Sequence, residues 1–144
     1  MRGKLTTIGL TMICLASGVL ADEQTRMTPE QRMKARYPQP VRVGDLIGIP
    51  LLDDSASTLG HVREVVRTKE NKIELIVAYH GFLRWRTRLV AVPIEVVGIA
   101  GRHLTSLDMP RSEYAGAPTW TSAPTSPDGR LSDDATIKIA LSRH

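Results

Sequence analysis

The chain has 144 residues, of which 42% are hydrophobic and 24% charged, proportions typical of an ordinary globular protein of one domain. Its formal net charge of +4 would fall to +2 on removal of Arg2 and Lys4, a surplus too small to indicate binding to nucleic acid or an acidic membrane. With a single cysteine, Cys14, the chain has no internal disulfide and no cysteine-ligated metal cluster.

Residues 1–21 have the layout of a secretory signal peptide. Two basic residues precede an apolar run from Leu5 to Leu20, which is shorter than a membrane-spanning helix needs and ends in small residues at Val19 and Ala21. Cys14 lies in this run and would leave with it. The pattern predicts a mature protein that begins at Asp22, is periplasmic or secreted, and has no stable membrane span. An uncleaved N-terminal anchor is the alternative.

Residues 22–40 are predicted to form an N-terminal arm of low internal stability. Thr28-Pro29-Glu30-Gln31 is a helix start, with a hydroxyl N-cap, a proline at the first helical position and a glutamine three residues after the cap. The helix is expected to last about two turns, because the prolines in Tyr37-Pro38-Gln39-Pro40 push the preceding residues toward extended geometry.

From Val41 onward, short β-branched runs alternate with turn residues, which predicts a mostly β fold. Polar connectors at Asp53–Ser57 and Lys69–Asn71 have hairpin length, so consecutive strands should pair antiparallel. Five or six strands in about seventy residues favour a small antiparallel β-barrel or a tightly rolled sheet, because a flat sheet that short would leave both edges unpaired. The residues expected in its core are Val62, Ile76, Val92 and Leu104.

The order of these runs resembles the PRC-barrel domain. The resemblance covers residues 41–120 and rests on the segments Val43–Gly48, Leu59–Val62, Gly81–Leu83 and Val90–Pro93, with a short helical turn expected at Arg111–Tyr114. It implies a small β-barrel that binds or assembles with other proteins and contributes no catalytic residues. Five residues are predicted to have structural roles at turns, bulges or the sheet edge: Gly44, Gly48, Gly60, Gly81 and Pro93.

The stretch Gly81–Arg88 departs from the family pattern. If it is extended, Arg84, Arg86 and Arg88 lie on one face and Trp85 on the other. One interpretation is a solvated strand face that adds little to stability. The other is a recognition surface, because arginine forms planar bidentate hydrogen bonds with carboxylate or phosphate and a tryptophan can stack beside it. Arg84, Trp85, Arg86 and Arg88 are therefore the candidate binding residues.

The sequence offers little for catalysis or metal binding. Ser57 and Ser112 lack the context of an activated nucleophile, and Asp53-Asp54 lacks the alternating ligands and glycine of a calcium loop. No two histidines have the spacing of ligands on one helical face, although a site assembled from distant strands stays open. We therefore expect no catalytic residue, no metal and no cofactor.

The chain ends with a predicted linker at 121–131, rich in Pro, Ser and Thr, and a strand or tail at 132–144. In the latter, Ile137, Ile139 and Leu141 alternate with Lys138, Ala140 and Ser142, which favours a strand. The interpretation of the whole is a non-catalytic exported module that binds another envelope protein and no nucleic acid. The alternative is a small anion or polyanion binder that uses the three arginines. The sequence does not indicate an oligomeric state.

Overall fold

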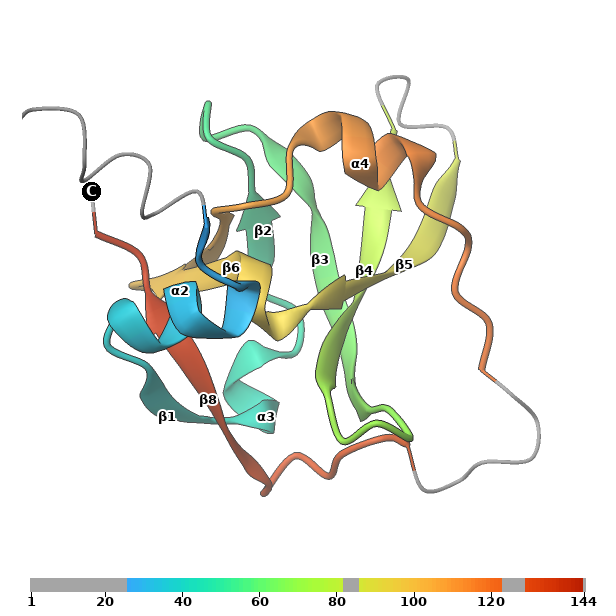
Figure 1. The fold of residues 1–144 in the computed structure, drawn as a ribbon. Helices are drawn as coiled ribbons and strands as arrows, with labels where there is room; N and C mark the ends of the chain where they lie inside the picture. The colour runs from blue at the N-terminus through green and yellow to red at the C-terminus, as the bar shows by residue number, and fades with distance from the viewer. Residues whose placement is uncertain (1–25, 82–85, 123–128, 144) are drawn as a thin grey trace, which may run out of the picture.

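The computed structural model describes residues 26–81, 86–122 and 129–143. In this part of the chain, eight strands form one sheet in the order β1-β8-β6-β7-β2-β3-β4-β5, with short helices around it (Figure 1). The strands are β1 (Gln39–Arg42), β2 (Pro50–Leu52), β3 (Thr58–Arg67), β4 (Ile73–His80), β5 (Thr87–Pro93), β6 (Val97–Ala100), β7 (His103–Ser106) and β8 (Thr136–Leu141). The helices are α2 (Pro29–Ala35), α3 (Val43–Leu46), α4 (Arg111–Gly116) and the 3₁₀ turn η1 (Ile94–Val96).

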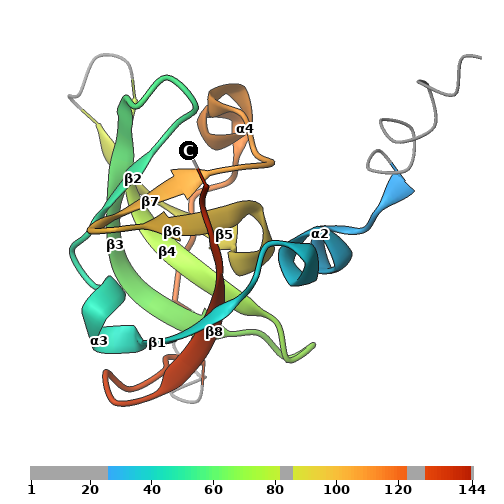
Figure 2. The same cartoon turned by 90° about the vertical axis from the view of Figure 1, so that its left-hand side faces the viewer.

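Strands β2 to β5 form an antiparallel meander, as the hairpin-length connectors predicted. Ala56 and Asn71 adopt positive φ angles of 60° and 63° in the two connecting turns, at Asp53–Ser57 and after β3. Both figures show α4 at one end of the sheet and α3 with the β1–β8 pair at the other (Figures 1 and 2). The meander therefore links the two ends of the molecule.

The fold is mostly β, as predicted, but the sheet is not closed into a barrel and is not antiparallel throughout. The sheet order has two edge strands, β1 and β5, and two of its pairs, β2 with β7 and β6 with β8, are parallel. Neither parallel pair joins strands that are consecutive along the chain, so no hairpin fixes their relative direction. Strand β8 arrives from the C-terminal segment and inserts between β6 and β1.

Two of the β-branched runs seen in the sequence are also interrupted by helical turns. In the run from Val41 to Gly48, Val43–Leu46 form α3, after which Gly48 takes a φ of +83°, a backbone conformation that favours glycine. In the run from Arg88 to Val97, Pro93 ends β5 and the chain turns through η1 before β6. A proline has no N–H for the ladder, which fits its place at the end of an edge strand.

The C-terminal segment is built into the sheet. The Arg67 N–H donates to the Gly129 carbonyl at 2.6 Å and the Leu131 N–H to the Val65 carbonyl at 2.8 Å, so the end of the predicted linker pairs with β3. Residues 123–128 lie outside the described ranges. In β8, Ile137 and Ile139 are buried while Thr136 and Lys138 are exposed, which is the alternation that the sequence shows.

The core lies on the inner face of the sheet. Val62, Ile76, Val92 and Leu104, the four residues predicted to be buried, all have no solvent exposure. Val62, Val92 and Leu104 belong to the main hydrophobic cluster, whereas Ile76 is buried outside it. Gly60 is also buried, and it lies beside a register shift between β2 and β3. A Cβ atom there would lie 2.2 Å from the Ala78 carbonyl oxygen, so glycine allows β3 to approach β4 closely.

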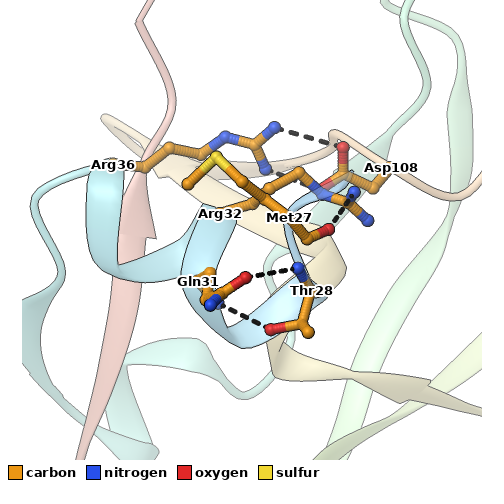
Figure 3. A network of polar contacts seen from close by, with 6 residues as sticks. All are labelled: Met27, Thr28, Gln31, Arg32, Arg36 and Asp108. Carbon is orange, nitrogen blue, oxygen red and sulfur yellow. Dashed lines mark hydrogen bonds and ion pairs between the residues drawn. The ribbon is translucent and has the colours of Figure 1, made fainter. Parts of the chain in front are cut away.

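Helix α2 packs beside η1 and β8 and is attached through Asp108, which follows β7 (Figure 3). Thr28 and Gln31 form a capping box at its start. At its end, Arg36 donates two hydrogen bonds to the Asp108 carboxylate, at 2.7 and 3.1 Å, and Arg32 Nε lies 3.4 Å from the same group. The Arg36 hydrogen bonds, with the charges of both arginines, hold the pKa of Asp108 below its ordinary value despite partial burial.

Replacing Asp108 by Asn should destabilise the fold by about 1 to 3 kcal/mol at neutral pH, because two part-buried guanidinium groups lose their anion. A carboxyl group whose pKa is lowered by folding stabilises the protein above its unfolded pKa, and loses that effect as the pH falls through the folded pKa. The difference between wild type and Asp108→Asn should therefore be full at pH 7 and shrink below about pH 4. Urea unfolding at several pH values measures it. A difference that stays constant to pH 3 would contradict this role.

Candidate functional site

An open cavity of about 800 Å³ lies at the α4 end of the sheet. The turn between β2 and β3 forms one wall, the adjoining ends of β3, β4 and β5 form the floor, and α4 contributes an arginine. Hydroxyl, imidazole and guanidinium groups give the cavity a polar lining. Its described lining residues are Asp53, Ser55, Ser57, Thr58, His61, His80, Gly81, Thr87 and Arg111.

Asp53 is the buried acid of this cavity, at 7% exposure. Its Oδ1 accepts hydrogen bonds from Ser55 N–H, Ser55 Oγ and Ser57 N–H, at 2.8 to 3.0 Å. Its Oδ2 accepts from Arg111 Nε at 2.9 Å and lies 2.8 Å from Nη2. Burial raises the pKa of Asp53, but these hydrogen bonds outweigh it and the pKa is lowered. Both carboxylate oxygens are thus committed to holding the turn and α4 together.

Two histidines meet on the cavity floor. In the β3–β4 register His61 lies opposite Ala78, so His80, two residues further along β4, lies diagonally from His61 on the same face. The two imidazole ring centroids are 6.0 Å apart and the ring planes are inclined at 69°. His80 Nδ1 lies 3.1 Å from Thr87 Oγ1, because Thr87 is opposite His80 in the β4–β5 ladder. No pattern in the sequence predicts this pair.

Arg88 does not belong to a free arginine face, contrary to both interpretations of Gly81–Arg88. Its guanidinium donates to the carbonyl oxygens of Tyr114, Ala115 and Ala117 at the end of α4. It also lies 5.4 Å from the centre of the Tyr79 ring, a cation–π distance. The prediction that Arg88 is surplus to folding is therefore wrong, because the last carbonyls of α4 need donors and Arg88 supplies them.

Tyr114 connects this arginine site to the core. Its ring has no exposure and stacks with Tyr79 at 6.2 Å, and its hydroxyl lies 2.8 Å from Ser106 Oγ. Burial raises the pKa of Tyr114 to about 12, so the phenol stays protonated and can share that hydrogen bond. Helix α4 is thus fixed by Arg111 at its start, Tyr114 in its middle and Arg88 at its end.

The other predicted binding residues are not assembled into a site. Arg84 and Trp85 lie outside the described residues. Arg86 is exposed just before β5, and within the described ranges the structure gives it no hydrogen bond or ion pair. Of the predicted structural residues, a Cβ atom at Gly44 would lie 3.3 Å from Asp133, while a side chain at Gly81 would enter open space.

The fold and the cavity define a small β-sheet module with a polar, internally hydrogen-bonded recess at one end. A family model of the PRC-barrel domain matches residues 40–105, slightly less than half of the chain. The match ends before α4 and β8, although both complete the structure. The search of curated proteins finds no match.

None of the described helices combines the length and apolar character needed to cross a membrane. Among the described residues, no group of three or more histidine, cysteine or carboxylate side chains is placed to hold a metal ion.

Proposed function

We propose that this protein is a non-catalytic, exported binding module that holds a partner protein of the cell envelope at the cavity beside α4. The PRC-barrel domain supports a binding role through the family resemblance. The signal-like composition of residues 1–21 supports export. The cavity offers a partner a recess with hydrogen-bonding groups on its rim.

The non-catalytic assignment rests on Asp53, because both of its carboxylate oxygens are occupied by hydrogen bonds. A serine nucleophile needs a neighbouring base with a free lone pair directed at its hydroxyl. Ser55 Oγ does donate to Asp53, but that oxygen also accepts two backbone N–H groups, and the other oxygen is held by Arg111. A carboxylate stabilised in this way is a weak base, so the group serves to fix the shape of the cavity wall.

The alternative function, binding of a small anion or polyanion along Arg84, Arg86 and Arg88, is less well supported. Arg88 is engaged by the carbonyl groups of α4 and by Tyr79. An anion could recruit it only by withdrawing it from those partners. This alternative therefore depends on Arg86, with Arg84, instead of on a row of three free cations.

The cavity proposal predicts that Thr58→Arg abolishes partner capture. Thr58 is an exposed strand residue on the cavity rim, so a long charged side chain there fills the recess without disturbing the core. The matched control is Thr136→Arg, an exposed strand threonine of β8 that does not line the cavity. The measurement is chemical cross-linking of the tagged protein in its native host, followed by purification and mass spectrometry of the adducts.

We expect one adduct to be formed by wild type and by Thr136→Arg and lost in Thr58→Arg. Because a protein interface is partly apolar, its capture should change little between low and moderate salt, whereas polyanion binding should weaken steeply. Equal capture by the two variants would contradict the cavity as the docking site. Loss of capture in Arg86→Gln, with steep salt dependence, would instead favour the anion alternative.

N-terminal sequencing of the same material tests export, for which the expected first residue is Asp22.

A further inference from the structure

The histidine pair on the cavity floor has a spacing and an environment that a bound metal ion would use. We propose that His61 and His80 together bind one divalent transition-metal ion of the Zn²⁺, Ni²⁺ or Cu²⁺ class, with its other coordination positions open to the cavity. This site does not depend on the protein partner proposed above.

The first argument is distance. A zinc–nitrogen bond is about 2.1 Å long, so an ion lies about 3.2 Å from the centre of each imidazole that binds it. Two such rings are then about 5 Å apart at a tetrahedral angle and about 6.4 Å apart in a linear arrangement. The observed separation of 6.0 Å between the centroids of His61 and His80 falls in this interval. The separation of the two rings is therefore compatible with a shared ion.

The second argument is the fixed backbone beneath the pair. Gly60, next to His61, lets β3 lie against the Ala78 carbonyl, and the cross-strand register places the two histidines on the same face. The strands carrying them have fully buried residues at Leu59 and Val77. Ligands held by rigid strands lose little entropy when a metal joins them.

The third argument is the orientation of His80. In the tautomer that carries its proton on Nδ1, His80 donates to Thr87 Oγ1 at 3.1 Å, and Nε2 keeps its lone pair for a metal. Histidines that bind metals commonly donate the other ring N–H to an oxygen in this way, which fixes the ring and raises its basicity. Thr87 is thus a positioning residue for the site.

The chemistry of the surroundings selects the class of ion. Imidazole nitrogen favours zinc, nickel and copper over magnesium and calcium, which prefer oxygen ligands. The nearby carboxylate of Asp53 is occupied by Arg111 and the turn, so it does not add the oxygen charge that calcium or magnesium would need. Two imidazoles leave positions for water or for a side chain of a bound molecule, and the open cavity admits either.

Zinc titration of the full chain, followed by calorimetry and by NMR of the histidine imidazoles, tests this proposal. In wild type we expect one equivalent of Zn²⁺ to bind, and the signals of His61 and His80 to shift together while that of His103 does not. His61→Gln and His80→Gln should each weaken zinc binding about tenfold or more, because each removes one of two protein ligands. His103→Gln, in β7 and away from the cavity lining, is the control and should bind as wild type.

Thr87→Val leaves both imidazoles in place and should weaken binding about tenfold through loss of ring orientation. Unchanged zinc affinity in both His61→Gln and His80→Gln would overturn the site. An equal loss of affinity in His103→Gln would also overturn it. Should either cavity variant fail to fold, the wild-type NMR titration alone decides. Independent shifts of His61 and His80, with different saturation points, would show binding to separate imidazoles and overturn the shared site.

Discussion

A chain that ends at Ser132 is expected to lose its cooperative unfolding transition. The deletion removes β8, which lies between β1 and β6 and buries Ile137 and Ile139. It also removes the carbonyl groups of Asp133 and Ala135 that accept the N–H groups of Gly44 and Val43. Loss of each buried isoleucine costs about 2 to 5 kcal/mol, and a domain has only about 5 to 15 kcal/mol in total. Urea denaturation followed by circular dichroism measures the effect.

A pair of point variants tests the same conclusion without removing any chain. Ile139→Ala should destabilise by about 2 to 5 kcal/mol, whereas Lys138→Ala, next to it on the exposed side of β8, should change stability by less than about 0.5 kcal/mol. A stable, cooperatively folding chain that ends at Ser132 would mean that β8 is a dispensable addition to the sheet.

Arg88→Gln should destabilise the fold by about 2 to 4 kcal/mol, because three carbonyl groups at the end of α4 lose a charged donor and Tyr79 loses a stacked cation. Thermal and urea unfolding measure the change. Arg88→Lys should recover only part of the loss, because an ammonium group lacks the planar fork that reaches several carbonyls at once.

The matched control is Arg86→Gln, two residues earlier in the same stretch. Arg86 is exposed and has no hydrogen bond or ion pair in the structure's described part, so its replacement should alter stability by less than about 0.5 kcal/mol. Equal, small effects of the two variants would restore the interpretation of a solvated arginine face. Equal, large effects would mean that Arg86 also supports the fold.

Local features of the fold were predictable because neighbouring residues decide them. The turn at Asp53–Ser57 and the one after β3 have hairpin length and polar residues, and both join antiparallel strands. The burial of Val62 and Val92 follows from strands with one face on the core. The order of segments also sufficed for the PRC-barrel resemblance, which the match to residues 40–105 supports.

The open sheet and its parallel pairs were not predictable by the same reasoning. Alternation shows that a strand has two faces, but it does not say which distant strand it pairs with. Thr136–Leu141 could have closed an edge or contacted a partner. Its place between β1 and β6 depends on pairings such as Gln39 with Ile139, which no local pattern encodes.

The site was the least predictable part. The two-residue period put Arg88 on the same face as Arg86, but it could not show that the end of α4 would cover that face at Arg88. His61 and His80 meet because of the cross-strand register, beside a register shift in β3. If the β3–β4 pairing is extrapolated from the turn at Lys69–Asn71, it brings the two histidines together only when that register shift is already known.

The pairing of Gln39 with Ile139 joins the first and last described strands of the chain. This pairing affects the time course of folding. Contacts between residues so far apart in sequence form slowly, because the intervening chain must lose its freedom before they contribute. The hairpins from β2 to β5 can form while the remaining residues are still being synthesised, but the edges of β6 and β1 stay unpaired until β8 emerges. During that interval the nascent protein exposes β-strand edges that another chain can pair with, so the arrival of β8 protects the protein from aggregation.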